Sequence, residues 1–387
     1  MPKRLLAMNV FDAAIERLKR LYAEGHTVVV MFSGGKDSGV CVELAIIAAT
    51  ETNRLPVYVA MRDEEVMLPG TFEYAERIVA REEVDFHWII AGQPIVNVFN
   101  RKMPYWWVFD DRLKPDEWVR MPPDFAEWIP EQNIAGIVNP KRFKVKKGKN
   151  LISVIGLRIE ESPNRRLGLH SSGGYLTKVD RYGVRKARPI YDWSAGDVWL
   201  SILKNKWDFN QAYSTMARYG MNRRNMRIGP PTLTVASAEQ LGVAFKAYPK
   251  WADKVARRLE GTRIVANFGK AALKPIRRSD ETWEGAYQRL CIDEAPEWIA
   301  KRAIIVRDKV LAQYGRHSSG PFPEVVSVFS ANLSRLVGSW RNLCNLMYLG
   351  DPFVQKATKA GIKYMEPSDF RDDLPDHRKQ WGGAPSW

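Results

Sequence analysis

The segment from Thr27 to Ser38 limits the fold of this chain more than any other feature. Residues 27–32 form a short run of β-branched and apolar residues, as expected of a central parallel strand that is covered on both faces. Ser33-Gly34-Gly35 then makes a glycine turn, and residues 40–49 form an alanine-rich stretch without helix breakers. A strand, a glycine turn and a helix in this order, followed by a further strand at 56–61, predict a right-handed βαβ unit.

The same alternation continues along the first half of the chain and predicts an α/β fold with a doubly wound, mostly parallel sheet. We expect further strands at residues 56–61, 86–90 and 151–155, and further helices at 10–23 and 71–81. Ligands of such sheets bind at the carboxyl ends of the strands. The residues that follow each strand are therefore the first candidates for a binding site.

The rest of the chain predicts an insertion and a second, helical region. Residues 97–150 are too long for a simple connection, so we expect an insertion that covers the site or a partner. Helical patterns at 251–259, 297–314 and 325–348 indicate a helical C-terminal region with a frayed tail after Pro367. The expected domains are therefore 1–232, which binds the ligand, and 233–387, which is helical.

The chain is strongly basic, with 59 Lys plus Arg against 44 Asp plus Glu and a formal net charge of +15. A positive field attracts nucleic acid, nucleotides or an acidic protein, although many of these charges could serve solubility alone. No apolar run is long enough to span a membrane, so we expect a soluble, cytoplasmic protein. The three cysteines and five histidines are dispersed, which argues against a disulfide framework, an iron–sulfur cluster and a histidine metal site.

The glycine turn carries the residues of an anion site. Two successive glycines let the backbone turn tightly, and the amides at the start of a helix carry a partial positive charge. Two serine hydroxyls and the lysine ammonium add donors, so a pyrophosphate or a sulfate fits this chemistry. An aspartate stands where a Walker A loop has Ser or Thr, which excludes that motif. The candidate nucleotide-binding residues of the turn are Ser33, Gly34, Gly35, Lys36, Asp37 and Ser38.

Two other strand ends add charged residues. Asp63 and Glu64 follow the second strand, where Asp63 could coordinate Mg²⁺, either residue could bind a ribose hydroxyl, or both could form only a solvated acidic turn. Arg158 and Arg165 follow the strand at 151–155, and arginine grips phosphate or sulfate through its planar fork. Both arginines are candidate nucleotide-binding residues. The candidate catalytic residues are Lys36, Asp37 and Arg158.

These motifs resemble those of the PP-loop ATP pyrophosphatases and of the phosphoadenosine phosphosulfate (PAPS) reductase family. The likeness is carried by S-G-G-K-D-S at 33–38, by G-x-R-x-x-E-S-x-x-R at 156–165 and by P-I-x-x-W-x-x-x-D-V-W at 189–199. It implies a fold like that of the adenine nucleotide alpha-hydrolases, with ATP or PAPS as the nucleotide and Mg²⁺ beside it. Segments 210–227 and 339–344 resemble a phage- and prophage-borne branch, which suggests a ParB-like partner protein.

The chain departs from this family where a reductase needs a nucleophile. PAPS reductases attack with a cysteine from a C-terminal tail, whereas residues 372–387 contain no cysteine. Relatives that move sulfur onto nucleic acid use cysteine pairs or clusters, whereas residues 221–227 hold Arg and Met. We therefore expect no thiolate nucleophile, no iron–sulfur cluster and no reduction by a cysteine of the chain itself.

A basic run at 141–149 is the last candidate site. Such a density of charge can neutralise phosphates, and the nearby Trp106, Trp107 and Trp128 could stack on bases. The run could instead be a solvated loop beside core tryptophans. The candidate nucleic-acid-binding residues are Lys141, Arg142, Lys144, Lys146, Lys147 and Lys149.

Three functions are compatible with these residues. The first is an enzyme that binds ATP and Mg²⁺ and adenylates an acceptor, with Lys36 and the loop amides stabilising the leaving pyrophosphate and Arg158 holding the acceptor or the developing charge. Such an enzyme could be linked, through its acceptor, to nucleic acid or to sulfur transfer. The second is a nucleotide-sensing or nucleic-acid-binding module without turnover. The third is a PAPS reductase that uses an external thiol.

Overall fold

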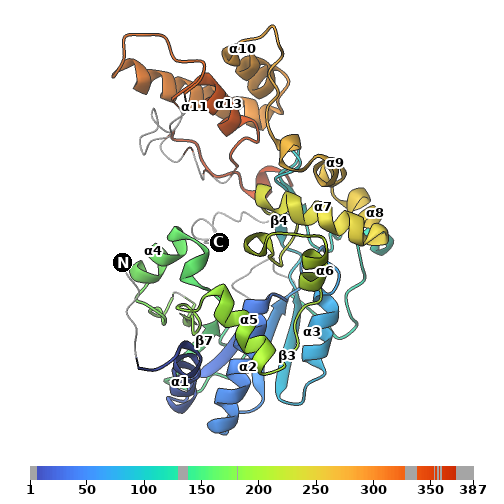
Figure 1. Cartoon of the computed structure of the whole chain (residues 1–387), viewed down its shortest axis with the longest axis vertical. Helices are drawn as coiled ribbons and strands as arrows, with labels where there is room; N and C mark the ends of the chain where they lie inside the picture. The colour runs from blue at the N-terminus through green and yellow to red at the C-terminus, as the bar shows by residue number, and fades with distance from the viewer. Residues whose placement is uncertain are drawn as a thin grey trace. The chain divides into compact units, whose positions relative to one another are not determined.

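The computed structural model describes residues 7–129, 138–180, 182–326, 338–352, 354, 357 and 360–371 (Figure 1). The chain divides into two compact units. The first consists of Met1–Gln93, Trp107–Pro231 and Ala247–Trp251. The second consists of Pro94–Trp106, Thr232–Lys246 and Ala252–Trp387, so the start of the expected insertion belongs to the helical unit.

A six-stranded, all-parallel sheet forms the centre of the first unit, which confirms the predicted α/β fold. Its spatial order is β6-β3-β2-β1-β7-β8. The expected strands are present, and β6 and β8 are additional edge strands that are too short or too polar to give a clear sequence pattern. The strands are β1 (Thr27–Phe32), β2 (Val57–Arg62), β3 (Val84–Ile90), β6 (Glu127–Trp128), β7 (Leu151–Val154) and β8 (Val184–Ala187).

The two faces of the sheet have different covers. Alternate residues of a strand point to opposite faces, so Val28 and Val30 of β1 pack with the helices, whereas Val29 packs on the other side. On that other side the cover includes Phe143, which comes from the basic run. The helices that share the first core are α1 (Val10–Ala23), α2 (Lys36–Glu51), α3 (Thr71–Val79) and α5 (Ala195–Lys204), and Figure 1 shows them beside the sheet.

The strand order reverses between β1 and β7. From β1 the chain proceeds to β2 and β3 on one side, and it returns to place β7 and β8 on the other side. Val30 of β1 pairs with Val154 of β7, so these two strands end close together. The crevice at such a reversal, outside the carboxyl ends of the strands, is where ligands of open α/β sheets bind.

The second unit is mainly helical, as predicted, and has its own core. Its core includes the buried residues Tyr287, Val306 and Leu343. A two-stranded sheet joins β4 (Pro94–Val96) to β5 (Tyr105–Trp107). Its helices include α9 (Thr262–Phe268), α11 (Glu297–Gly315) and α13 (Trp340–Met347). The other helices and turns of the chain are α4 (Pro163–Ser171), α6 (Ala212–Arg218), α7 (Ala238–Ala247), α8 (Pro249–Arg258), α10 (Trp283–Gln288), η1 (Pro115–Glu117), η3 (Ile159–Glu161), η4 (Arg223–Asn225), η5 (Val235–Ser237), η6 (Gly269–Leu273), η7 (Arg289–Asp293, a π-helix) and η8 (Pro367–Asp369).

One predicted helix is wrong as a continuous element. Residues 325, 326, 338 and 339 are not helical, and α13 begins at Trp340. Ser339 caps this helix, because its side chain accepts a hydrogen bond from the amide of Asn342. Residues 327–337 lie outside the described part of the chain, as do residues 372–387 of the expected tail. None of the helices in the described ranges has the length and apolarity of a membrane span.

Candidate functional site

The glycine turn lies at the strand reversal, directly after β1. Gly34 has a φ of +71°, and a Cβ at this position would lie 2.4 Å from Cγ2 of Thr71, so only glycine fits. Gly35 is the N-cap of α2 and has no side chain to cap the first amides of that helix. The amino end of α2 is therefore presented at the crevice, as an anion site requires.

The two serines of the turn have different roles. Ser38 is buried, and its hydroxyl donates to the carbonyl of Gly35 at 2.9 Å and accepts from the amide of Ser33 at 3.2 Å. Ser38 therefore holds the turn closed. Ser33 is exposed, with its Oγ 3.2 Å from Oγ of Ser38. Its hydroxyl is the one placed to reach a ligand.

The structure brings the three predicted catalytic residues together. The carboxylate of Asp37 accepts from Nζ of Lys36 at 2.9 Å and from Nε of Arg158 at 2.5 Å. The guanidinium of Arg158 is buried, and its other nitrogens donate to Glu160 at 3.1 Å and Glu161 at 3.2 Å. Three carboxylates thus fix Arg158, and Asp37 orients both cations beside the turn.

A second glycine-dependent contact joins the end of β7 to the same place. A Cβ on Gly156 would lie 2.8 Å from the carbonyl carbon of Asp37 and 2.9 Å from the amide nitrogen of Ser38. Both atoms belong to the backbone, so neither can rotate away. This close approach places Arg158, two residues later, beside the amino end of α2.

Arg165 lies close to the same cluster, near the start of α4. Ser162 is the N-cap of that helix, and its side chain accepts from the amide of Arg165. Arg165 forms an ion pair with Glu161, which also binds Arg158. Burial lowers the pKa of the Arg165 guanidinium, and the nearby Arg227 lowers it further. Cations thus gather on this side of the turn.

Asn210 and Tyr213 support the turn, and the sequence did not single them out as site residues. The side-chain nitrogen Nδ2 of Asn210 donates to the carbonyl of Gly34 and to Oγ1 of Thr71, both at 2.9 Å. The hydroxyl of Tyr213 accepts from the amide of Lys36 at 3.2 Å, and burial raises the pKa of this phenol. An asparagine before a helix predicts only a cap, and Asn210 does accept from the amide of Ala212. The contact of Asn210 with the turn joins segments that are distant in the sequence, so no local sequence pattern predicts it.

Of the two predicted acidic residues after β2, Asp63 contacts the insertion, whereas Glu64 pairs with the last residue of β2. Asp63 is fully buried and accepts from Nε1 of Trp88 at 2.7 Å, from the amide of Glu65 at 2.9 Å and from Arg120. Burial raises the pKa of this carboxyl, although Arg120 opposes the shift. Glu64 forms an ion pair with Arg62. Both oxygens of Asp63 therefore have donors already, which is a poor arrangement for holding a metal ion.

Glu65 binds the same insertion through backbone groups. Its carboxylate accepts from the amides of Phe109 at 2.7 Å and Val119 at 3.0 Å. Together with Asp63 it fastens residues 109–120 to the end of β2. The described residues contain no group of three or more His, Cys, Asp or Glu that could hold a metal ion.

The basic run lies near the amino ends of the strands, whereas the turn lies at their carboxyl ends. It precedes β7, and the amide of Thr27, the first residue of β1, donates to the carbonyl of Asn150 at 3.2 Å. Arg142 pairs with Glu127, whereas Lys141, Lys144, Lys146, Lys147 and Lys149 are exposed. Of the three tryptophans, Trp106 and Trp107 are buried in the core and only Trp128, 53% exposed, could stack on a base.

All three cysteines are buried. Cys41 lies in α2 as a small core residue, and burial raises the pKa of its thiol. Cys291 and Cys344 are dispersed in the sequence but lie together in the second unit, with their sulfurs 4.0 Å apart. The contact with Cys344, together with burial, raises the pKa of the Cys291 thiol. Each of these shifts disfavours the thiolate form.

Comparison with known proteins supports the sequence motifs. Residues 27–219 match the family described as the phosphoadenosine phosphosulfate reductase domain. The chain is 24% identical to the uncharacterized protein YbdN of Escherichia coli (strain K12), with 97% of each chain covered.

Several solved structures show weaker likenesses. The FMN adenylyltransferase of Candida glabrata, in complex with FAD and inorganic pyrophosphate, is 13% identical with a TM-score of 0.35, over 53% of this chain and 59% of that enzyme. This chain therefore spans less than two thirds of the adenylyltransferase. The PAPS reductase of Candida auris is 12% identical with a TM-score of 0.30, over 59% and 98%. The U34-tRNA thiolase NcsA of Methanococcus maripaludis is 14% identical with a TM-score of 0.28, over 67% and 80%.

The family match covers the parallel sheet from β1 to β8, the turn after β1 and the arginines after β7. Residues 27–219 therefore belong to the phosphoadenosine phosphosulfate reductase domain family.

Proposed function

We propose that this chain binds ATP at the turn 33–38 and transfers the adenylate group to an acceptor, with release of pyrophosphate. One observation carries the proposal: Asp37 holds Lys36 and Arg158 together, at 2.9 and 2.5 Å, beside the amino end of α2, where the N-cap Gly35 provides no side chain. A helix start with two adjacent cations suits a group whose negative charge grows during the reaction. Pyrophosphate leaving the α-phosphorus of ATP is such a group.

In this mechanism the acceptor supplies the nucleophile. Its lone pair attacks the α-phosphorus, the bond from that phosphorus to the bridging oxygen breaks, and the electron pair leaves with pyrophosphate, while the proton of the attacking group passes to solvent water. Lys36 and the amides of the turn stabilise the charge on pyrophosphate, and Arg158 stabilises the charge around the α-phosphoryl group. Asp37 is a positioning residue for both cations. We assign Mg²⁺ to the substrate, bound to the phosphates of ATP, because the oxygens of Asp63 are engaged by protein donors.

When Cys41, Cys291 and Cys344 are replaced together by Ala, the rate at which adenylated acceptor and pyrophosphate form is expected to stay within about twofold of wild type. Each sulfur is buried, and adenylate transfer needs electrostatic stabilisation rather than a protein thiolate. Alanine is chosen because a serine hydroxyl in these apolar sites would lack partners. The measurement is pyrophosphate release from Mg²⁺-ATP, with water and with a panel of amine, thiol and nucleic-acid acceptors.

A reductase would behave differently in the same set of variants. The parallel assay supplies PAPS with an external thiol and measures sulfite. Sulfite production that one of the three single Cys→Ala variants stops would contradict the adenylation proposal and support reduction. ATP binding without pyrophosphate release in the presence of any acceptor would favour the nucleotide-sensing module.

A second proposal concerns the basic run. Five of its six cationic side chains are exposed near the amino ends of the strands. Changing Lys144, Lys146 and Lys147 to Glu is expected to weaken nucleic-acid binding and to flatten its salt dependence. Each neutralised duplex phosphate contributes a slope of about 0.9 log units per log unit of salt. Affinity for a DNA duplex, measured by fluorescence anisotropy between about 50 and 200 mM salt, gives the slope.

The matched control reverses Lys178, Lys204 and Lys250, which are exposed elsewhere. Because the basic run lies near the amino ends of the strands and the turn at their carboxyl ends, both triple variants should bind ATP like wild type. Equal affinity and equal slope in the two triple variants would assign the run to solubility.

A further inference from the structure

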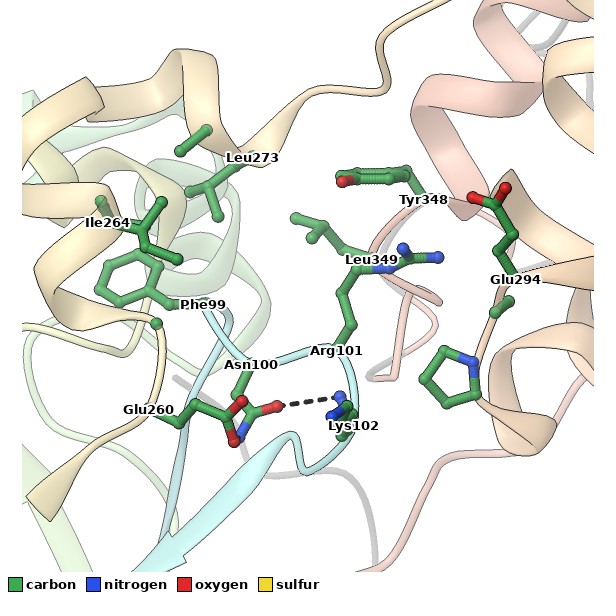
Figure 2. Close-up of a pocket in the computed structure, with 15 residues that line it drawn as sticks. Phe99, Asn100, Arg101, Lys102, Glu260, Ile264, Leu273, Glu294, Tyr348 and Leu349 are labelled. Atoms are coloured by element: carbon green, nitrogen blue, oxygen red, sulfur yellow. Dashed lines mark hydrogen bonds between the residues drawn. The ribbon is translucent and has the colours of Figure 1, made fainter. Parts of the chain in front are cut away.

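The second unit contains a pocket of about 520 Å³ that the proposed reaction does not use (Figure 2). One wall is apolar and comes from Phe99, Ile264 and Leu273. Figure 2 shows Tyr348 and Leu349 on the facing wall. Pockets of roughly 300–1,000 Å³ with mostly apolar walls and a few polar groups are typical of small-molecule sites.

Backbone contacts preform this pocket. Gly261, at the start of α9, has a φ of +87°, and a Cβ there would lie 2.4 Å from the carbonyl oxygen of Phe99. On the other side, Nε1 of Trp298 donates to the carbonyl of Arg101 at 2.9 Å. A guanidinium nitrogen of Arg101 donates to the carbonyl of Leu290 at 2.6 Å. The loop that carries Phe99 and Arg101 is thus fastened at both walls.

The charged side chains that line the pocket differ in their hydrogen-bond and ion-pair partners. Glu260 accepts from the side-chain amide of Asn100 at 3.1 Å, and Glu294 pairs with Arg289 at 3.5 Å. In contrast, no carboxylate in the described part of the chain forms an ion pair with Arg101 or Lys102. The Nε atom of Arg101 is buried without a hydrogen-bond partner. The two acids therefore have donors, whereas the two cations retain capacity for an anion.

Tyr348 adds a flat surface next to this charge. The guanidinium carbon of Arg101 lies 4.3 Å from the centroid of the Tyr348 ring. Such stacking holds the arginine in place and leaves the ring edge as part of the wall. Aromatic and apolar side chains on the two sides favour a ligand with a flat apolar body.

We propose that this pocket binds a small molecule that joins a flat apolar body to an anionic group, with the body between the two walls and the anion at Lys102 and Arg101. None of the residues that line this pocket belongs to the turn 33–38, so the proposal stands whether or not ATP is cleaved there. Its ligand is thus a second small molecule, either a reactant or an effector.

The test uses the full chain and anilinonaphthalene sulfonate, a fluorescent aromatic anion of suitable size. Wild type is expected to bind one probe per chain at this site, with a rise in fluorescence. Ile264→Trp fills the pocket and should weaken binding at least tenfold. Ile264 is 59% exposed, so the larger side chain costs little stability. Lys102→Glu should weaken binding several-fold through charge.

Two matched controls carry the same changes outside the pocket. Ile276→Trp replaces an isoleucine that is 77% exposed, and Lys270→Glu reverses an exposed lysine of η6. Both controls, and Lys36→Ala, should bind the probe like wild type. Absence of saturable binding, or equal binding by Ile264→Trp and wild type, would overturn the site. If phenylnaphthylamine, which lacks the sulfonate, binds as tightly and Lys102→Glu has no effect, the anionic part of the proposal is wrong.

Discussion

Gly156→Ala is expected to weaken ATP binding more than tenfold and to lower the free energy of unfolding by about 1–3 kcal/mol, the usual cost of overpacking. The added Cβ would lie 2.8 Å from the backbone of Asp37, where no flexible side chain can move aside. Either β7 or the start of α2 must shift, and a shift separates Arg158 from Asp37. Calorimetry with ATP and unfolding in urea measure the two effects.

Gly168→Ala is the matched control. Gly168 lies in α4, and a Cβ there would meet nothing within 4 Å. Alanine also favours a helix over glycine by about 1 kcal/mol, so this control should be as stable as wild type or more so. If Gly156→Ala binds ATP like Gly168→Ala, the approach of β7 to the turn does not build the site.

Lys36→Ala is expected to reduce pyrophosphate release by about 10²–10³-fold, the size of effect seen when one preorganised charge stabiliser is removed. The ammonium of Lys36 contacts Asp37 beside the amino end of α2, so its loss removes positive charge where pyrophosphate would leave. The fold should persist, because the backbone amide of Lys36 still donates to Tyr213. Initial rates with saturating Mg²⁺-ATP isolate the chemical step from binding.

Two further variants serve as comparisons for the rate of Lys36→Ala. Lys204→Ala removes an exposed lysine in the last turn of α5 and should leave the rate unchanged. Lys36→Arg keeps the charge but changes its shape, and partial recovery would indicate electrostatic stabilisation. An unchanged rate in Lys36→Ala would remove the residue from the mechanism.

The parts of the fold that could be predicted are those with a local cause. β1 and its turn were predicted because a buried parallel strand and a pair of glycines each leave a distinct local pattern. Arg158 was predicted because it follows a strand end, where ligands of such sheets bind. Asp37, which binds Arg158, lies far from it in the sequence, and only the fold brings the two side chains together.

The parts that were missed depend on contacts between distant segments. Asn210 supports Gly34 across 176 residues, and Cys291 meets Cys344 across 53 residues. Periodicity and turn chemistry carry no information on such pairs. The helix predicted at 325–348 was wrong for another reason. Apolar residues stand at helical spacing on both sides of Ser339, so the pattern did not reveal that α13 begins only after this residue.

The most direct measurement is a calorimetric titration of ATP into wild type and Lys36→Ala. The central claim is that the turn 33–38 binds the phosphates of the nucleotide. It predicts one ATP per wild-type chain and an affinity at least tenfold lower in the variant, since a hydrogen bond to a charged group contributes about 1.5–3 kcal/mol. Circular dichroism of both proteins should be the same. Equal affinities for ATP, with both proteins folded, would contradict the claim.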